Sequence, residues 1–488
     1  MYSVRDIKNY TDKYHKIAKR ALKEEKLNAA LDALYHCGAL QHTVNINLKD
    51  DISENLILKL SYKFNQIKYQ ESSIYCLFYD SIAISNVALS MQYLKALISL
   101  EKKFIYLINV NTWKENASKD LVDLAKQCGN CEVIIVDSTK SMVEKIEIIR
   151  KIILKERPGK VLLHMGNSDP VGCVAFSNIS GCTKYLINHG DEQFWLGATV
   201  LDYSIEFRGM GKDASVKYRG LRDEQCLVLP YYPVLKSEKF KGFDFQLPVG
   251  AVRIFSGGRF TKVYAENGKF MKVVTAILNR HPQAFFIFAG AGDAEPMKAY
   301  VKKKGLENRW KVIAYRNDLL EVLRHMDIYL GTYPQTGGLM AQYAVAAGLP
   351  IVEMDTKNGG LTEDLLPKFN GGYRITYESW KDYNEQVDKL IDDFDYRSNV
   401  SEKIKNSNIS EHEFCMGLQN LLTSNTSQYP IIHREINLEI RTKRLLEAEN
   451  RYMHRIPGIM CNMYMARYYP LTVVLNFIRY IYFRKGKS

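Results

Sequence analysis

The sequence predicts an α/β protein with two doubly wound parallel sheets, a helical segment before the first sheet and a basic helical tail after the second. Three observations lead to this prediction. Short apolar runs alternate twice with helical stretches of about ten to fifteen residues. A Pro-punctuated segment separates the two series, and helix-type apolar spacing is found at both ends of the chain. Alternation of this kind gives right-handed β-α-β units and parallel sheets.

Length and composition fit a globular protein with separate cores. The chain has 488 residues, of which 46% are hydrophobic and 25% charged. At about 100–200 residues per domain, two or three domains are expected, and fibrous and low-complexity classes are excluded. Nine scattered cysteines and a polar N-terminus indicate a reduced, cytoplasmic protein. Cys128 and Cys131 have no second pair nearby to complete a zinc site, so no metal is expected.

Residues 1–70 are expected to be helical, because apolar side chains recur there at the three-to-four spacing of an amphipathic face. A first α/β domain is expected over residues 71–235. Its strands are predicted within 73–81, 104–110, 131–137, 160–166, 184–188 and 203–207, and its helices within 87–101, 117–128 and 141–156.

A linker is expected over residues 236–248, where prolines and glycine interrupt the pattern. The second α/β domain is expected over residues 249–425. Its strands are predicted within 251–258, 284–290, 310–315, 327–333 and 350–354, and its helices within 267–280, 294–305, 318–326 and 337–348. Open α/β sheets bind ligands at the carboxyl ends of their strands, so two such domains favour an enzyme acting on a small molecule.

The tail, residues 426–488, concentrates positive charge. Lys plus Arg is 67 and Asp plus Glu is 54, a net charge of +13, and residues 451–488 contain seven of the bases and no acid. Nucleic-acid binders more often spread this charge over one face, so no nucleic-acid partner is expected. Apolar and aromatic runs broken by Arg467 and Arg479 are too short to span a bilayer but suit a helix lying in the membrane interface. The alternative is that this segment packs back on the N-terminal domain.

The stretch after Gly331 has the pattern of a phosphate site. A predicted strand ends at Gly331, a loop closes with Thr336, Gly337 and Gly338, and a helix begins there. The free N–H groups and dipole of a helix start favour an anion, and glycine lets the anion approach closely. The alternative is an ordinary Thr N-cap with glycines that serve the turn.

A second basic element follows the first strand of this domain. Gly258 is followed by Arg259 and Lys262, and Lys269 lies on the next helix. Arg and Lys beyond a strand end can neutralise a diphosphate leaving group. By itself this element is better explained as solvated surface charge.

Two further motifs complete the pattern: A-x-G-x-P at residues 346–350 and G-G-x-x-E ending at Glu363. Together with the G-R and lysine element, they resemble the donor-binding half of glycosyltransferases with the two-Rossmann GT-B fold, in their retaining glycogen-synthase-like (group 1) branch. The resemblance implies a nucleotide-diphosphate sugar as donor, a UDP-sugar first, with no further cofactor and no metal. It implies donor contacts from residues of several loops: Arg259, Lys262, Lys269, Tyr315, Thr336, Gly337, Gly338, Gln342 and Glu363.

One departure leaves the stereochemistry open. That branch usually has two glutamates eight positions apart, and the matching positions here are Gln335 and Tyr343. The T-G-G loop is closer to the O-GlcNAc transferase-like branch, which inverts. Neither retention nor inversion is therefore carried over.

In the first domain, the segment 184–220 resembles the acceptor-facing wall of bacterial GT-B enzymes. His189 and Asp191 follow a predicted strand at its carboxyl end, where a catalytic group is expected. An imidazole with an unperturbed pKa near 6.5 can act as general base or hydrogen-bond the donor. The alternative is a structural His-Asp pair. Asp202, Glu206 and Arg208 are weaker candidates.

The combined expectation is a peripheral enzyme on the cytoplasmic face of the membrane. It would transfer a sugar from a nucleotide sugar to a lipid-linked or polysaccharide acceptor in bacterial surface glycan synthesis, such as capsule, lipopolysaccharide or exopolysaccharide. Three alternatives remain: a nucleotide-sugar epimerase, a protein glycosyltransferase, and a non-catalytic partner in a glycan-assembly complex.

Overall fold

The computed structural model describes the chain except for residues 86, 111–114, 236–237, 358 and 486–488. The first two residues of the predicted linker and the last three of the tail therefore lie outside the described residues. The chain forms two compact units. The first unit comprises Met1–Leu229, His412–Gln428 and His433–Ser488, and the second comprises Pro230–Glu411 and Tyr429–Ile432. The predicted helical segment is thus part of the first unit, and so is the predicted tail except for Tyr429–Ile432. Residues 412–425, predicted in the second domain, also belong to the first unit.

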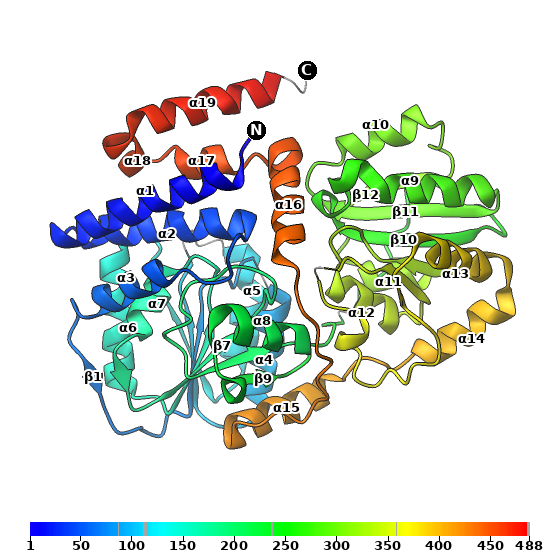
Figure 1. Ribbon diagram of the computed structural model, residues 1–488. Helices are drawn as coiled ribbons and strands as arrows, with labels where there is room; N and C mark the ends of the chain where they lie inside the picture. Colours follow the sequence, from blue (N-terminus) through cyan, green and yellow to red (C-terminus); the bar gives the residue numbers. More distant parts are fainter. Residues whose placement is uncertain (86, 111–114, 236–237, 358, 486–488) are drawn as a thin grey trace. The chain divides into compact units, whose positions relative to one another are not determined.

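A seven-stranded parallel sheet forms the centre of the first unit (Figure 1). The strand order is β4-β3-β2-β5-β7-β8-β9. The order reverses between β2 and β5, which makes their carboxyl ends the switch point of this sheet. The strands are β2 (Cys76–Asp80), β3 (Phe104–Ile108), β4 (Cys131–Ile135), β5 (Lys160–His164), β7 (Thr183–Ile187), β8 (Tyr203–Glu206) and β9 (Cys226–Val228).

Helices and short elements connect these strands. The helices are α4 (Val87–Ser99), α5 (Glu115–Gln127), α6 (Met142–Glu156), α7 (Pro170–Phe176) and α8 (Gly209–Arg219), with a 3-10 turn η1 (Asp223–Gln225). A two-stranded parallel pair joins β1 (Ile67–Lys68) to β6 (Ile179–Ser180). β2 and β3 are buried along their whole length, as expected for the centre of a sheet covered on both faces.

Three N-terminal helices pack on this unit: α1 (Val4–Lys23), α2 (Leu27–Val44) and α3 (Asp51–Ser61). Ser3 and Asp6 form a capping box that fixes the start of α1. The buried Glu54 of α3 accepts hydrogen bonds from the N–H groups of Gly197 and Thr199, at 2.8 and 3.0 Å. These contacts attach the helices to the loop that follows β7.

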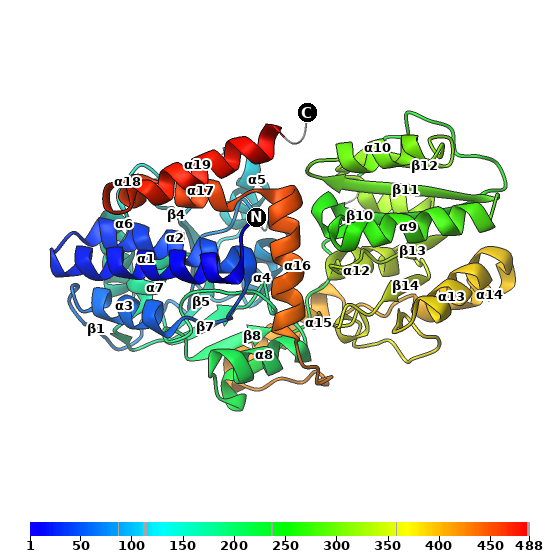
Figure 2. The ribbon, with the colours of Figure 1, turned by 45° about the horizontal axis from the view of Figure 1, so that its top comes forward.

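The tail returns to the same helices. It contains α16 (Leu438–Ala448), a π-helical turn η4 (Glu449–Met453), α17 (Ile456–Met460), α18 (Met463–Tyr468) and α19 (Pro470–Lys485), and it is preceded by α15 (Glu411–Ser424). Figures 1 and 2 show α17 to α19 lying along α1. Ile456, Met460 and Met465 are buried in the same core as Tyr14. The tail therefore packs on the N-terminal helices, the arrangement considered above as the alternative to a free interfacial helix.

The second unit has a six-stranded parallel sheet in the order β12-β11-β10-β13-β14-β15. Its switch point lies between β10 and β13. The strands are β10 (Val252–Arg259), β11 (Ala284–Ala291), β12 (Trp310–Ala314), β13 (Ile328–Leu330), β14 (Ile351–Met354) and β15 (Thr376–Tyr377). The helices are α9 (Ala265–Arg280), α10 (Glu295–Lys303), α11 (Leu319–Arg324), α12 (Gly338–Ala346), α13 (Trp380–Asp392) and α14 (Phe394–Ile404), with 3-10 turns η2 (Phe260–Val263) and η3 (Glu363–Leu365).

Glycine permits an unusually close approach between the central strands of this unit. A Cβ atom at Gly290 of β11 would lie 2.1 Å from the carbonyl oxygen of Gly258 on β10. Gly258 itself has a φ of +139°, a backbone conformation that favours glycine. These two glycines set the direction in which the chain leaves β10.

Within the described residues, no helix is both long and apolar enough to cross a membrane.

Candidate functional site

Three loops meet at the carboxyl ends of β10, β13 and β14 in the second unit. The Nζ atom of Lys262, after β10, donates a hydrogen bond to the carbonyl oxygen of Thr336, after β13, at 2.8 Å. A Cβ atom at Gly359, after β14, would lie 3.8 Å from the Thr336 hydroxyl oxygen. The structure therefore brings the two basic and glycine-rich elements of the sequence together at the switch point of the sheet.

The loop after β13 leads into α12 without a side-chain cap. Gly337 is the N-cap residue, so the N-cap position has no side chain to bond the free N–H groups of the first turn. The alternative in which Thr336 is an ordinary N-cap is therefore wrong. A Cβ atom at Gly338 would lie 2.3 Å from Cδ1 of the buried Leu365, so the helix start needs glycine there. The uncapped N–H groups make this end of α12 suitable for an anion.

Arg259 offers an available positive charge at the carboxyl end of β10. It ends β10, and its side chain is exposed. Among the described residues, no hydrogen bond or ion pair engages its guanidinium. Other arginines of the unit already have an acidic partner. Arg253 pairs with Asp327 at 3.0 Å, and Arg316 pairs with Asp318 at 2.6 Å. Because its charge is not consumed internally, Arg259 can pair with a phosphate.

Lys269 on α9 contacts Trp380 of α13. Its Nζ atom is 5.2 Å from the centre of the Trp380 ring. The Trp380 ring packs edge-on against Tyr333, with centroids 5.0 Å apart. Of the two predicted lysines, Lys262 is therefore the one that the structure places in the phosphate loop, and Lys269 has a cation–π contact with Trp380.

Sequence reasoning missed an acid in this region. The Tyr333 hydroxyl donates a hydrogen bond to Oε2 of Glu266 at 2.8 Å. Glu266, Asn267 and Gly268 all have positive φ, at 53°, 55° and 66°. Such conformations are costly for residues other than glycine and concentrate at functional sites. The Asn267–Gly268 pair was the available signal, because Asn-Gly commonly marks a turn inside a helical pattern.

The remaining donor candidates divide into exposed and buried positions. Tyr315, directly after β12, is 73% exposed and can pack against a ligand ring. Gln342 is fully buried, and its Nε2 atom donates to the carbonyl oxygens of Tyr231 and Leu365 at 2.7 and 3.1 Å. A side chain enclosed in this way cannot reach a nucleotide. The prediction that Gln342 contacts the donor is corrected to a structural role that anchors α12.

Glu363 and the two departures from the family pattern also have internal partners. The Glu363 carboxylate accepts hydrogen bonds from the N–H and hydroxyl of Thr376, at 3.0 and 2.7 Å, and so anchors β15. The Tyr343 hydroxyl donates to the carbonyl oxygen of Val234 at 2.8 Å. The carbonyl oxygen of Gln335 accepts from the Thr332 hydroxyl and closes the loop.

His189 in the first unit lies among other imidazoles. Its Nε2 atom is 3.0 Å from Oδ1 of Asn167, and its ring centre is 5.6 Å from that of His164. Burial, together with the nearby His164 and His42, lowers the pKa of His189 to about 3. The imidazole is therefore neutral at pH 7 and a weak base, which favours a hydrogen-bonding role over the predicted general-base role.

Asp191 is fully buried and ion-paired. Its carboxylate lies 2.5 Å from Nε of Arg208, and its carbonyl oxygen accepts a hydrogen bond from Arg219 at 2.8 Å. Glu206 is equally buried and accepts from Asn188, at 2.7 Å. With its carboxylate enclosed, Asp191 cannot touch a substrate, and the predicted catalytic role is corrected to a structural one.

A cavity lies at the switch point of the first unit. It has a volume of about 330 Å³ and is lined by residues that follow β2, β3 and β5, among them Ser81, Asn109 and Asp169. Asn109 is only 6% exposed. Its Nδ2 atom donates to the Tyr79 hydroxyl at 2.7 Å, whereas its Oδ1 atom has no hydrogen-bond partner among the described residues, which exclude 86 and 111–114. A buried acceptor without a donor is costly unless a ligand or water supplies one.

A larger cavity, of about 570 Å³, lies in the second unit at the other end of α12. It is lined by residues 345–348, the end of that helix, and by Lys368 and Lys405. The nine residues of α12 separate it from the Thr336 loop by about 13 Å, at 1.5 Å per residue. The anion site is therefore identified by its N–H groups and charges rather than by cavity size.

One cluster of potential metal ligands lies in the described part of the first unit: His15, Cys37 and Asp50. Nε2 of His15 is 2.6 Å from Oδ2 of Asp50, and Gln41 and Ser53 donate to the same oxygen at 2.8 and 2.6 Å. These contacts join α1, α2 and α3 into one network, so we interpret the cluster as a structural ion pair.

Two doubly wound parallel sheets in one chain are the architecture of the GT-B fold. Residues 243–407, about a third of the chain, match the family of glycosyl transferases group 1. This segment covers the three loops of the site. The expected resemblance to GT-B glycosyltransferases is thereby confirmed.

Solved structures agree on the fold. An O-GlcNAc transferase mutant from Thermobaculum terrenum is 14% identical, with 91% of this chain and 82% of that one covered and a TM-score of 0.51. Anabaena HepE in complex with UDP and glucose is 14% identical over 72% of this chain and 100% of that one, with a TM-score of 0.54. The lipopolysaccharide outer core galactosyltransferase WaaB in its apo form is 14% identical over 72% of this chain and 99% of that one, with a TM-score of 0.50. No curated protein matches the sequence.

Proposed function

We propose that this protein is a glycosyltransferase that transfers a sugar from a nucleotide-diphosphate sugar to a glycan acceptor. The observation that carries the proposal is the hydrogen bond from Lys262 to the carbonyl of Thr336. This contact joins a strand-end cation to an uncapped helix start. The lysine and the helix start both favour a diphosphate, and the exposed Arg259 is a third group that does so.

The chemistry follows from where negative charge develops. The bond between the anomeric carbon and the diphosphate oxygen breaks, and the nucleotide diphosphate leaves with the electron pair. An acceptor hydroxyl oxygen forms the new bond to the anomeric carbon and releases its proton to a base. Arg259, Lys262 and the N–H groups at the start of α12 stabilise the leaving phosphate. Removal of one such donor typically raises the barrier by about 2.7–4 kcal/mol.

The switch-point cavity of the first unit is a candidate site for the acceptor. Its lining includes the unpartnered carbonyl of Asn109 and the hydroxyl of Ser81. A sugar hydroxyl would donate to the Oδ1 atom of Asn109. The Ser81 hydroxyl already hydrogen-bonds the Asp169 carboxylate and accepts from the N–H of Gly166 at 2.9 Å. A volume of about 330 Å³ is comparable to the smaller ligand pockets, which start at about 300 Å³.

The finer assignment rests on resemblance and on the tail. We propose a UDP-sugar as donor, bound without a metal ion or other cofactor, because HepE has been solved with UDP and glucose. We propose a lipid-linked or polysaccharide acceptor in bacterial surface glycan synthesis, because WaaB is a lipopolysaccharide galactosyltransferase. The site of action would be the cytoplasmic face of the inner membrane, which the basic tail would contact.

Calorimetric titration with UDP-, GDP-, ADP- and CMP-sugars in the presence of a chelator tests the donor site. We expect one UDP-sugar to bind, and Arg259→Ala and Lys262→Ala each to weaken binding by about tenfold or more, because each removes a charge-assisted phosphate contact worth about 1.5–3 kcal/mol. Arg280→Ala is the matched control, because that arginine pairs with Asp388 at 2.7 Å. Equal binding by Arg259→Ala and wild type would exclude this site.

Product analysis distinguishes the proposal from its rivals. Release of UDP that requires a glycan acceptor supports glycosyl transfer. Epimerised sugar formed without an acceptor would indicate an epimerase, and transfer to a peptide would indicate a protein glycosyltransferase. Nucleotide binding without turnover on any acceptor would indicate a non-catalytic partner.

A further inference from the structure

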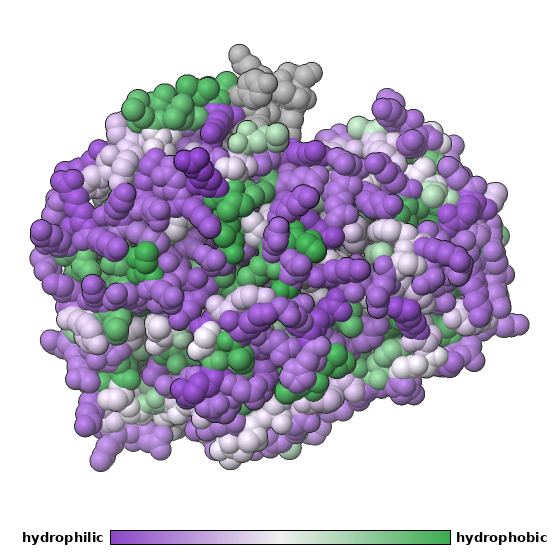
Figure 3. Space-filling view, viewed as in Figure 1, coloured by the Kyte–Doolittle hydropathy of each residue, from purple (hydrophilic) through white to green (hydrophobic). Residues whose placement is uncertain are grey.

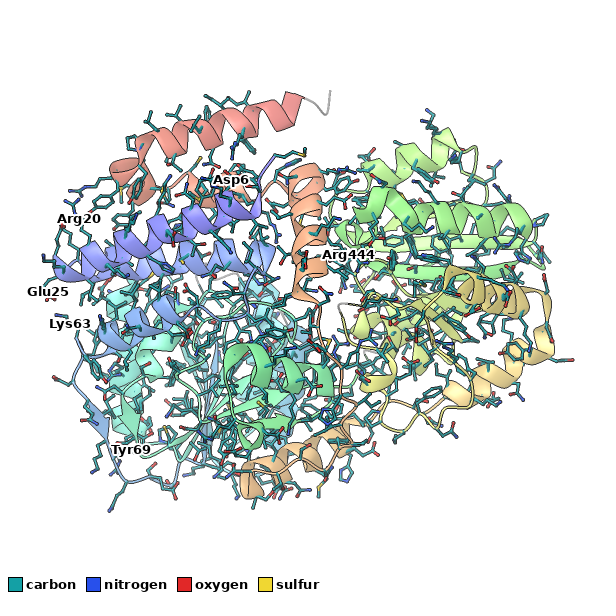
Figure 4. All side chains as sticks on the ribbon, in the orientation of Figure 1. Asp6, Arg20, Glu25, Lys63, Tyr69 and Arg444 are labelled. Atoms are coloured by element: carbon teal, nitrogen blue, oxygen red, sulfur yellow. The ribbon has the colours of Figure 1, made fainter. Side chains whose placement is uncertain are left out.

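Helix α19 is docked on the first unit through its polar face. Nζ of Lys13 donates to the Thr472 hydroxyl at 2.6 Å, and the Tyr2 hydroxyl donates to Oδ1 of Asn476 at 2.8 Å. Arg479 donates to the Tyr10 hydroxyl at 3.1 Å and lies 3.8 Å from Asp6, which Figure 4 labels on α1. The inward residues 472, 476 and 479 follow helical spacing.

The opposite face of α19 is apolar and exposed. The exposed fractions are 77% for Leu471, 52% for Val474, 58% for Leu475, 56% for Ile478 and 40% for Ile481. These positions also recur every three or four residues. Figure 3 shows the resulting hydrophobic surface along α19. A surface helix of a soluble protein normally has the reverse orientation, with apolar residues inward.

Positive charge surrounds the start of this helix. The guanidinium groups of Arg20 and Arg467 lie 5.0 and 5.8 Å from the centre of the Tyr468 ring. Nζ of Lys13 lies 5.3 Å from that of Tyr469. Figure 4 labels Arg20 at the end of α1. Residues 451–488 contain no acid, and the acids of the neighbouring helix that pair with this basic set are Glu24, 2.7 Å from Arg20, and Asp6, 3.8 Å from Arg479.

We propose that the outward face of α19 inserts flat into the headgroup region of an anionic lipid leaflet, while its polar face stays bound to α1. Leu471, Val474, Leu475, Ile478 and Ile481 enter the acyl boundary, and the basic residues near Tyr468 contact lipid phosphates. The inference deepens the proposed function, because a protein docked in this way is held where a lipid-linked acceptor would be.

A lipid surface fits this face better than a second copy of the chain. Two copies joined through α19 would bring two acid-free basic tails together, and like charges repel. A leaflet containing anionic lipid instead attracts each nearby Lys or Arg by about 1 kcal/mol. Tyrosines at the boundary of an apolar stripe are also suited to the headgroup region.

Flotation of the full-length protein with lipid vesicles tests the proposal. The probes are vesicles of phosphatidylcholine alone and vesicles with about a third of phosphatidylglycerol. We expect flotation with the anionic vesicles and a loss of at least about a hundredfold in partition for Leu475→Glu with Ile478→Glu, because each buried side chain is worth about tenfold or more. The control is Leu58→Glu with Leu154→Glu, whose side chains are 42% and 55% exposed on other helices.

The outcomes separate this inference from the proposed function. The inference would be overturned if the Leu475/Ile478 variant floated as well as the wild type, or if the control variant lost as much flotation. It would also be overturned if the wild-type protein stayed in the soluble fraction. A concentration-dependent dimer that the variant abolishes, without flotation, would assign the face to a second copy instead. UDP-sugar binding by the variant, measured by calorimetry, reports on the donor site independently.

Discussion

At the scale of single residues, histidines in the first unit respond to pH with opposite signs. Burial is the largest single influence on His15 and lowers its pKa, but the hydrogen bonds and charges of Asp50 and Cys37 together outweigh burial and raise the pKa to about 10. Burial lowers the pKa of His42 to about 4 and that of His189 to about 3. His15 therefore stabilises the folded state as an imidazolium, whereas His42 and His189 must be neutral.

This difference predicts how stability depends on pH. The contribution of His15 is complete below its unfolded pKa near 6.5 and is lost as pH rises toward 10, with a slope of at most about 1.4 kcal/mol per pH unit. We expect His15→Gln to flatten the dependence of the unfolding free energy between pH 7 and 10, measured by urea denaturation. His433→Gln is the control, because that histidine is exposed. A slope equal to that of wild type would contradict the ion-pair interpretation.

The lowered pKa values of His42 and His189 affect stability at acidic pH. As pH falls below about 6.5, the unfolded chain takes up protons on His42 and His189 that the folded protein does not bind, so stability decreases. We expect His42→Gln to reduce this acid-side loss between pH 6.5 and 5 in the same denaturation experiment. Retention of the full loss would show that other groups cause it.

At the scale of elements, the close contact between β10 and β11 fixes the loop that holds Arg259. A Cβ atom at Gly290 would meet the carbonyl oxygen of Gly258, which belongs to the backbone and has little freedom to move. We expect Gly290→Ala to separate the strands locally, to weaken UDP-sugar binding in calorimetry and to lower the unfolding midpoint. Gly129→Ala is the matched control, because a Cβ atom at that position would have no described neighbour within 4 Å. Unchanged binding would mean that the loop position does not depend on this contact.

Prediction from the sequence succeeded where the signal is local. The strand predicted over 251–258 is β10 over Val252–Arg259, and the helix predicted over 337–348 is α12 over Gly338–Ala346. Apolar periodicity and glycine positions carry this information along a short stretch of chain. The strand predicted over 327–333 ends earlier, at Leu330, because the Thr332 hydroxyl closes a loop on the carbonyl of Gln335.

Prediction failed where a partner lies far away in the sequence. Gln342 and Asp191 have residue types and positions that suit a binding site, but Tyr231 and Arg208 enclose them. Asn109 gave no signal, because its unpartnered carbonyl is apparent only once the cavity around it is formed. Local pattern identifies where strands end, and tertiary contacts decide which side chains stay accessible there.

At the scale of the whole molecule, the chain leaves the first unit at Leu229 and returns to it at His412. The helices that complete the N-terminal core therefore follow the second unit in the sequence and are synthesised after it. Tyr14 illustrates this dependence: its hydroxyl donates to the carbonyl of Ile459 at 2.6 Å and accepts from Asn462 at 2.7 Å. The first unit cannot reach its final packing until the tail has been added.

Deletion of residues 463–488 tests this dependence. The deletion removes Asn476 and exposes Tyr2, which is 4% exposed in the complete chain, and Tyr10, which is 6% exposed. We expect faster amide hydrogen exchange in peptides from α1, because the helix loses packing and hydrogen bonds on one side. Peptides from β10 and β13 should be unchanged, and so should UDP-sugar affinity, because the donor loops lie in the second unit. Unaltered exchange in α1 would show that the tail adds no stability there, and loss of nucleotide binding would show that the tail supports the donor site as well.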